Sequence, residues 1–354
     1  MNPDPPSVGV VRAVVVPKEN AERLLRNLLT ERLVDRTIKT VKRGDSILIP
    51  VTAEPRFDLT PFRARLEPHV DFPDRHRPRD PRPEIRRRLI AAGIPLEQAP
   101  RRWERIGDVL VIRFPPEGHS KARPIAKIFG TVLGARTVVE DRSGIHGPMR
   151  VPDVRVLWGD GTETVHTEGG IRYAMDVARV MFSSGNLAER VGIADRVRPG
   201  AVVVDLFAGI GYFSLPIAVR GRARIVYACE LNPVAFQYLI ENTRLNRTPN
   251  LVPLLGDCRV IAPRGVADWV IMGHFDARDY LDVAFDALRG SGTIVYHELC
   301  PKEQYPDAMT RKLAAAARAR WMNIKAIHTR IVKSYAPGIV HSAAQVEVTR
   351  QNRS

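Results

Sequence analysis

The segment VVVDLFAGIGYFSLP, residues 202–216, decides how the C-terminal half of the chain folds. Three valines lead into Asp205, and Ala208-Gly209-Ile210-Gly211 then turns the chain into a second apolar run. A β-branched run that ends in a glycine-rich turn indicates a buried strand followed at once by a helix. A tight strand–helix turn needs glycine with or without a ligand, so the glycine pair alone is weak evidence of a binding site.

Acidic residues end the next two predicted strands as well. The strand ARIVYACE ends in Glu230, 25 residues after Asp205, and the following strand ends in Gly256-Asp257-Cys258. Carboxylates at the ends of parallel strands can accept hydrogen bonds from a ribose diol and an adenine amine, although each could instead cap a helix. Together with a two-glycine turn they are similar to a class I S-adenosylmethionine-dependent transferase. The dinucleotide fingerprint would require a third glycine.

From about residue 173 onward, predicted strands and helices alternate. Continuous β-branched runs separated by amphipathic segments predict an α/β fold, a Rossmann-like, doubly wound sheet with helices on both faces. Strands are expected at 201–207, 223–230, 250–257, 267–273 and 292–298, and helices at 215–221, 233–246 and 276–290. Two more strands around Ala336-Pro337-Gly338 predict a C-terminal antiparallel hairpin at the sheet edge.

Two small α+β domains are predicted to precede this catalytic domain, which spans 173–354. The first covers 1–72, with strands at 8–16 and 45–51 around a helix at 19–34. Residues 73–88 are dense in proline and arginine, which predicts a linker because proline removes backbone donors and like charges repel. A strand-rich middle domain then covers 89–172, with a hairpin expected around Gly159-Asp160-Gly161.

The charge of the chain is unusual for its size. The formal net charge is +15, and residues 1–150 hold 29 Lys and Arg against 19 Asp and Glu, a net of +10. Clustered positive charge favours an anionic partner, with nucleic acid as the default candidate and a merely solvated basic surface as the alternative. We therefore expect the N-terminal part to dock an RNA or DNA.

Three cysteines lie far apart and form no C-x-x-C pair, which argues against a disulfide framework or a zinc site, so no metal is expected. The start MNPDPPSVGVV lacks the features of a signal peptide, and no run of 18 apolar residues exists. The sequence thus predicts a reduced, cytoplasmic protein away from membranes. Nothing in it indicates an obligate protein partner.

Further segments occur in a fixed order and resemble one family. MFSSGNLAERVGI (181–193), AGIGYFSLPIAVRG (208–221), ADWVIMGH (267–274), IVYHE (294–298) and KSYAPGIVH (333–341) are similar to the tRNA wybutosine-synthesising protein 2 family, the archaeal and eukaryotic aminocarboxypropyl transferases. The related tRNA (guanine-N1)-methyltransferase family shares the three-domain plan. The resemblance is specific over about 100–350 and weaker over 8–50, and the presence of that first domain resembles the longer form of the family.

The resemblance implies a reaction. The family transfers the 3-amino-3-carboxypropyl group of S-adenosylmethionine to C7 of 4-demethylwyosine at tRNA position 37 and releases 5′-methylthioadenosine. Enzymes that methylate base nitrogens usually carry an Asn-Pro-Pro-Tyr-like motif after this strand, and the guanine methyltransferases an Asn-Leu-Pro-like one. Here the strand ends Met272-Gly273-His274. A ring carbon offers no hydrogen-bonding handle for such a motif, and Gly273 is expected to remove bulk beside the incoming base.

The family pattern also implies site residues. Arg190 is suited to the cofactor carboxylate through paired donors, and only the backbone N–H of Cys258 is expected to contribute, because the family often has Asn there. A helix-start hydroxyl and a surface arginine are the plain alternatives for Ser183 and Arg190. The cofactor-binding set is Ser183, Arg190, Asp205, Gly209, Gly211, Glu230, Asp257 and Cys258.

The sequence does not identify any side chain as the general base. His274 and His297 are expected at strand ends facing the site, where neutral imidazole could accept a proton, although a lone histidine there is more often structural. Positioning can supply much of the rate, since the sulfonium is already activated. Tyr212 and Tyr335 are candidates for stacking on the extruded base, with core packing as the equal alternative.

Position 37 lies in the anticodon loop, so its base can be flipped out without opening a duplex, and phosphate contacts would hold the rest of the tRNA. Arginines around Trp103, Arg105 among them, belong to the basic segments, although each cation alone could be merely solvated. The RNA-binding candidates are Arg86, Arg87, Arg88, Arg101, Arg102, Lys121, Arg123 and Lys127. A tRNA guanine-N1 methyltransferase and a non-catalytic tRNA-binding factor on the same fold are the two alternative functions.

Overall fold

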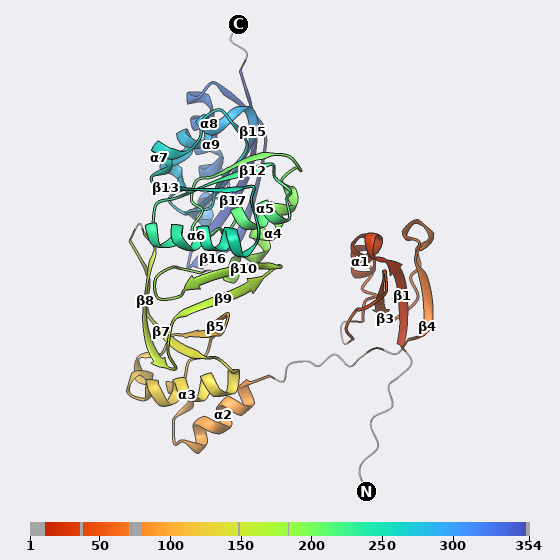
Figure 1. The fold of residues 1–354 in the computed structure, drawn as a ribbon, viewed down its shortest axis with the longest axis vertical. Helices are drawn as coiled ribbons and strands as arrows, with labels where there is room; N and C mark the ends of the chain where they lie inside the picture. The colour runs from red at the N-terminus through yellow and green to blue at the C-terminus, as the bar shows by residue number, and fades with distance from the viewer. Residues whose placement is uncertain are drawn as a thin grey trace. The chain divides into compact units, whose positions relative to one another are not determined.

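The computed structural model of the chain describes residues 11–35, 38–70, 72, 80–147, 149–182 and 184–351. The chain forms two compact units, Met1–Asp80 and Pro81–Ser354 (Figure 1). Among the described residues, no helix is long and apolar enough to cross a lipid bilayer.

The first unit is a four-stranded antiparallel sheet with one helix. Its strands lie in the order β2-β3-β1-β4. The helix α1 (Ala21–Thr30) buries Leu24 and Leu28 completely against Val14 and Ile49 of the sheet. The predicted strand–helix–strand pattern is therefore confirmed. The strand bounds are β1 Val11–Pro17, β2 Val41–Arg43, β3 Ser46–Val51 and β4 Arg65–Val70.

The second unit begins with a helix where the sequence predicts the end of a linker. Helix α2 (Arg82–Ala91) occupies the last part of the segment 73–88, whereas 73–79 lies outside the described residues. Glu84 accepts hydrogen bonds from Arg87 and Arg88, and this offsets the repulsion between the arginines of the helix. The linker expectation is therefore wrong from residue 82 onward.

The middle domain is a four-stranded sheet covered by two helices. Its order is β5-β6-β7-β8, and β6 and β7 run parallel because helix α3 (Ala122–Leu133) connects them. Helix α3 lies against this sheet and α2 packs on α3 (Figure 1). Their shared core includes the buried Phe129 of α3. The strand bounds are β5 Trp103–Ile106, β6 Val109–Ile112, β7 Thr137–His146 and β8 Val151–Trp158.

The hairpin expected around Gly159-Asp160-Gly161 is wrong. The chain does turn there, and both glycines have positive φ, but β8 pairs with β7. The next strand, β9 (Glu163–Glu168), pairs with β10 (Ile171–Asp176) through a turn at Gly169-Gly170. The Asp-Gly turn therefore carries the chain from the middle sheet to a separate hairpin, which a local turn signal cannot distinguish from a hairpin of its own.

The C-terminal domain is the doubly wound sheet that the sequence predicts. Seven strands lie in the order β13-β12-β11-β14-β15-β17-β16, the first five parallel and the last two antiparallel. The C-terminal hairpin β16–β17 at the edge is confirmed. The strand bounds are β11 Val202–Asp205, β12 Ile225–Glu230, β13 Leu251–Leu255, β14 Ala267–Met272, β15 Leu288–Pro301, β16 Met322–Ala336 and β17 Ile339–Arg350.

Helices cover both faces of this sheet. One core joins α4 (Leu187–Arg196), α5 (Ser214–Val219) and α6 (Pro233–Leu245) to one face, and a second core joins α7 (Cys258–Ile261), α8 (Leu281–Ala287) and α9 (Asp307–Ala319) to the other. The β9–β10 hairpin packs into the first core, where Asn242 of α6 bonds to both backbone polar groups of Ala174. Strand β10 therefore crosses the boundary predicted near residue 172.

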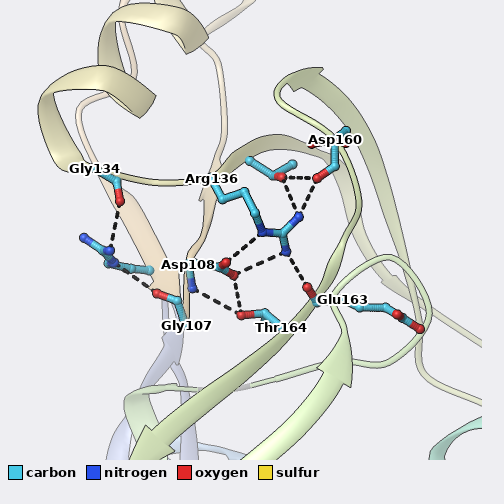
Figure 2. A network of polar contacts seen from close by, with 9 residues as sticks. Gly107, Asp108, Gly134, Arg136, Asp160, Glu163 and Thr164 are labelled. Atoms are coloured by element: carbon cyan, nitrogen blue, oxygen red, sulfur yellow. Dashed lines mark hydrogen bonds and ion pairs between the residues drawn. The ribbon is translucent and has the colours of Figure 1, made fainter.

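A single guanidinium fastens the middle sheet to the turn that leads into the β9–β10 hairpin (Figure 2). Arg136 donates to Asp108 at 2.7 Å and to the carbonyls of Asp160 and Glu163 at 2.5 Å each. Thr164 of β9 donates to the other Asp108 oxygen at 2.7 Å. Because hydrogen bonds to a charged donor are stronger than neutral ones, this joint fixes how the middle sheet meets the catalytic domain.

We expect Arg136→Ala to lower the free energy of unfolding of the second unit by about 2 kcal/mol, because several charge-assisted bonds are lost at a partly exposed site. All four tryptophans (103, 158, 269 and 321) lie in that unit, so urea unfolding followed by tryptophan fluorescence reports on it. The matched control is Arg113→Ala, which removes one exposed pair with Asp141 and should cost less than about 1 kcal/mol. Equal losses in the two variants would contradict the assignment of the joint to Arg136.

Candidate functional site

Asp205 ends β11 and holds the glycine-rich turn from inside. Its carboxylate is fully buried and accepts hydrogen bonds from the Ser214 hydroxyl at 2.6 Å and the Phe207 backbone N–H at 3.3 Å. Burial raises the pKa of Asp205 to about 6. The Asp205 side chain therefore stabilises the turn from inside the protein. A bound ligand would be held by the outward-facing groups of the turn and not by the Asp205 carboxylate.

Glu230 ends β12 and grips the same turn from the neighbouring strand. One of its oxygens accepts from the Gly209 N–H at 2.6 Å and the other from the Asn232 N–H at 2.7 Å, and burial raises its pKa. Gly209 and Gly211 have φ of 58° and 103°. A Cβ on Gly209 would also collide with the ring of Tyr212. Glycine is thus required here by backbone conformation and by close packing.

Asp257 and Cys258 follow β13 at the same edge. Asp257 accepts from the Arg259 N–H at 2.9 Å, so it caps the short helix α7, and it forms an ion pair with the Arg259 side chain at 2.5 Å. That hydrogen bonding holds the pKa of Asp257 below its ordinary value. The Cys258 thiol is buried, and burial raises its pKa to about 12. Asp257 therefore caps a helix, as the alternative interpretation proposed. The Cys258 thiol stays neutral.

Arg190 is a buried residue of α4, so the alternative interpretation as a surface arginine is wrong. It is 2% exposed, donates to Glu168 of β9 at 2.7 Å, and lies over the Phe182 ring at 5.2 Å. This pairing satisfies a buried charge and ties α4 to the β9–β10 hairpin. Ser183, the other residue expected to contact the cofactor in this segment, lies outside the described residues.

Gly273 follows β14, but it does not clear space for a base as expected. A Cβ there would lie 2.5 Å from the ring of Phe213, which packs directly against it. Glycine is needed so that Phe213 can pack at the start of α5. The structure therefore explains Gly273 by its packing against Phe213 and not by space for a substrate.

His274 lies at the end of β14, as the sequence predicts. Its side chain is 25% exposed, its ring is 5.4 Å from Phe207, and its Nδ1 accepts from the Asp276 N–H at 3.1 Å. Burial, with a smaller effect of the Arg150 charge, lowers its pKa. A neutral imidazole that accepts at Nδ1 carries its proton on Nε2, so the free nitrogen is a donor. In this conformation His274 can hydrogen-bond a substrate but cannot accept its proton.

His297 is not at a strand end, and that expectation is wrong. It lies inside β15, which continues to Pro301, and it is 1% exposed. Its Nδ1 is 2.9 Å from Nε2 of His341 on β17. Burial and the neighbouring His341 lower its pKa to about 3, with Glu189 opposing and Arg330 and Arg196 adding to the effect. His297 is a core residue, because β15 is longer than its apolar run suggests.

Sequence reasoning missed the loop between β7 and β8, which reaches the catalytic domain. The Met149 carbonyl accepts from the Asn232 side chain at 2.9 Å. Arg150 Nη2 lies 3.1 Å from Met181 Sδ, and the Arg150 guanidinium lies 5.7 Å from the centre of the Phe275 ring. The only local signal was a lone arginine after Gly147-Pro148 before a strand, which is common in surface loops.

The two tyrosines that are candidates for stacking on the base differ in their surroundings. The Tyr212 hydroxyl bonds to the Met181 carbonyl and its ring packs on Phe182 at 5.9 Å, so the packing alternative holds for it. Tyr335 is 56% exposed and lies 5.6 Å from the Phe275 ring.

The basic candidates lie on α2 and α3 and in the segments before β5 and α3. Arg87 and Arg88 pair with Glu84, and Arg105 donates to the carbonyls of Gly107, Leu133 and Gly134. The other candidates are exposed to solvent: Arg86, Arg101, Arg102, Lys121, Arg123 and Lys127. These six cations therefore remain available at the surface of the middle domain.

Three known families match the chain in order along it. The tRNA methyltransferase 5 N-terminal domain matches residues 13–57, and the TYW2 N-terminal domain matches 87–162. The TRM5/TYW2 methyltransferase domain matches 164–325. The last two meet at the turn that Arg136 holds.

Two curated relatives and one solved structure illustrate the similarity. The tRNA(Phe) (4-demethylwyosine(37)-C(7)) aminocarboxypropyltransferase of Pyrococcus horikoshii is 35% identical over 272 residues, covering 75% of this chain and 97% of that protein. The tRNA (guanine(37)-N(1))-methyltransferase Trm5b of Pyrococcus abyssi is 31% identical over 331 residues, covering 92% and 95%. The structure of Methanocaldococcus jannaschii TYW2 in complex with AdoMet matches with a TM-score of 0.59 at 32% identity, covering 71% of this chain and all of that one.

The buried histidine pair predicts acid sensitivity. Burial lowers the pKa of His297 to about 3 and that of His341 to about 4, whereas both would titrate near 6.5 when unfolded. As pH falls from about 6.5 to 4, the unfolded chain binds protons that the folded chain does not, so stability falls. The double variant His297→Gln/His341→Gln should show a shallower loss in urea unfolding over this range. The exposed His328→Gln variant should behave as wild type, and a double variant with the wild-type slope would refute the assignment.

Proposed function

The chain belongs to the TRM5/TYW2 family of tRNA-modifying enzymes, and we propose that it is an aminocarboxypropyltransferase of this family. It transfers the 3-amino-3-carboxypropyl group from S-adenosylmethionine to C7 of 4-demethylwyosine at tRNA position 37. The other product is 5′-methylthioadenosine. The observation that carries this assignment is the 35% identity to the Pyrococcus horikoshii aminocarboxypropyltransferase across 97% of that protein.

The residues at the sheet edge fit the donor. Each Glu230 oxygen accepts one backbone N–H, which leaves lone pairs on a partly exposed carboxylate for two ribose hydroxyls. The turn of Gly209 and Gly211 lets the backbone approach the ligand closely, and Asp257 with the N–H of Cys258 would meet the adenine edge. Arg190, already paired with Glu168, would face the cofactor carboxylate with Ser183. These assignments are part of the proposal.

The bound cofactor supplies a sulfonium with three electrophilic carbons, so the protein selects the group by holding one carbon in line with the nucleophile. The new bond joins C7 to the γ-carbon of the amino-acid arm. The bond from that carbon to sulfur breaks with its electron pair going to sulfur, and the C7 proton leaves to water. With Nδ1 accepting from the Asp276 N–H, His274 would hydrogen-bond the base through its Nε2–H, and His297 is too deeply buried to take part.

The partner in this proposal is tRNA, bound through its anticodon loop. The exposed cations of the middle domain would hold phosphates and give affinity without sequence choice. The three cysteines are free and buried, which fits a reducing compartment, and we place the enzyme in the cytoplasm.

One observation favours the rival guanine-N1 methyltransferase. The Pyrococcus abyssi Trm5b matches 92% of this chain, including the first unit, whereas the aminocarboxypropyltransferase matches 75%. Against methylation, β14 runs into Met272-Gly273-His274 and lacks an amide side chain to orient a ring nitrogen.

The two activities separate by the labelled atom that enters RNA. With S-adenosylmethionine labelled at the carboxyl carbon and tRNA carrying 4-demethylwyosine, we expect label in the tRNA, at C7 of the base by mass analysis of the nucleoside. With methyl-labelled donor we expect none. Methyl label in guanosine 37 without carboxyl label would establish the methyltransferase, and no transfer together with no donor binding would favour the non-catalytic tRNA-binding factor.

Glu230→Gln should weaken binding of S-adenosylmethionine by about tenfold or more. The neutral amide accepts hydrogen bonds more weakly and would direct an N–H group at one of its present donors, and each bond to a charged acceptor contributes roughly 1.5–3 kcal/mol. Isothermal titration calorimetry measures the affinity. Glu241→Gln, an exposed change on α6, is the matched control and should leave the affinity unchanged. An unchanged affinity in Glu230→Gln would remove Glu230 from the proposed donor site.

A further inference from the structure

Three side chains from distant parts of the chain meet beside the site, and we call them the aromatic lip: Phe275, Tyr335 and Arg150. Phe275 follows β14, Tyr335 lies at the end of β16, and Arg150 comes from the middle domain. The Phe275 and Tyr335 rings are 5.6 Å apart at 76°, and the Arg150 guanidinium is 5.7 Å from the Phe275 ring.

The lip is built as a surface and not as core. Tyr335 is 56% exposed, although Phe275 beneath it packs on the buried His341 at 4.8 Å. The T-shaped contact with Phe275 leaves at least one face of the Tyr335 ring uncovered by that partner. An exposed aromatic face that is held in place from below, beside a cation, matches the stacking platforms that bind unpaired nucleic-acid bases.

The lip is connected to the glycine-rich turn through packed side chains. Arg150 contacts Met181, whose carbonyl accepts from the Tyr212 hydroxyl, and the Tyr212 ring packs against Gly209. A reacting base must enter beside that turn, whereas the exposed Tyr335 is separated from it by four residues in contact with one another, Tyr212, Met181, Arg150 and Phe275. The base that reaches Tyr335 is therefore a different base from the one that reacts.

The charges around the lip suit a phosphate-linked partner. Arg150 is part of it, and Lys333 of β16 pairs in register with His341, against which Phe275 packs. The Lys333 ammonium group also donates to the Asn186 side chain at 3.0 Å. Of the carboxylates near the lip, Asp276 has a side chain that is 88% exposed and Glu189 is paired with Arg330. The nucleotide backbone can thus pass the two cations while a base stacks on the tyrosine.

We propose that the aromatic lip is a second base-binding site, on which an unpaired anticodon-loop base next to position 37 stacks while the target base is in the pocket. This rests on the proposed function, because it takes tRNA position 37 as the target. It assigns the C-terminal hairpin a direct role in substrate binding.

The test uses the full-length protein with an anticodon stem-loop that carries 4-demethylwyosine at position 37 and 2-aminopurine at 36 or 38. We expect wild type to change the 2-aminopurine fluorescence at one of the two positions, and Tyr335→Ala to lose this change and raise the KM for the RNA about tenfold, within the roughly 5- to 150-fold range of one lost stack. Tyr335→Phe keeps the ring and should behave as wild type. Affinity for S-adenosylmethionine and the melting temperature should stay unchanged in both variants.

Trp321→Ala is the matched control, since Trp321 is 64% exposed just before the opposite end of β16 and should not affect RNA binding. Tyr335→Ala with wild-type KM and fluorescence would overturn the lip while leaving the proposed function intact, provided wild type transfers the carboxyl label. A parallel loss of S-adenosylmethionine binding would also overturn it, because the tyrosine would then act through the pocket. Absence of transfer by wild type would count against the proposed function itself.

Discussion

Two carboxylates at the ends of neighbouring strands hold one backbone turn, and the site depends on that arrangement. Asp205 bonds to the turn from beneath, and Glu230 accepts the Gly209 N–H from the next strand. Burying two acids costs free energy, which raises the pKa of both, and the backbone N–H and hydroxyl donors offset that cost. The turn is thereby fixed before any ligand arrives, with Glu230 partly open to solvent. Preorganisation of this kind favours binding because little remains to be ordered.

The rest of the site is assembled outward from the turn by contacts between distant segments. Tyr212 directly follows Gly211, and its hydroxyl donates to the Met181 carbonyl. The Met181 side chain in turn contacts Arg150 of the middle domain. Arg150 can reach that point because the joint at Arg136 fixes the middle sheet on the hairpin that packs under α6 (Figure 2). The middle domain therefore contributes to the site. This explains why its loop, far from the donor motifs in sequence, lies beside them in space.

The sequence predicted those features that arise from local pattern. The doubly wound sheet, the Gly209 turn and the acidic strand ends follow from period, β-branched runs and turn chemistry, which act over a few residues. What it could not predict depends on partners far along the chain. His297 looked like a strand-end residue because its partner His341 is 44 residues away. Gly273 looked like space for a substrate because its packing against Phe213 is visible only in three dimensions.

The by-product of turnover tests the central claim most directly, because it reports which carbon–sulfur bond breaks. Purified protein, S-adenosylmethionine and tRNA carrying 4-demethylwyosine would be incubated and the nucleoside products separated by chromatography with mass detection. The account predicts 5′-methylthioadenosine in amounts equal to the modified tRNA. S-Adenosylhomocysteine as the sole by-product would contradict it, since the methyl group and not the amino-acid arm would then have been presented to the base.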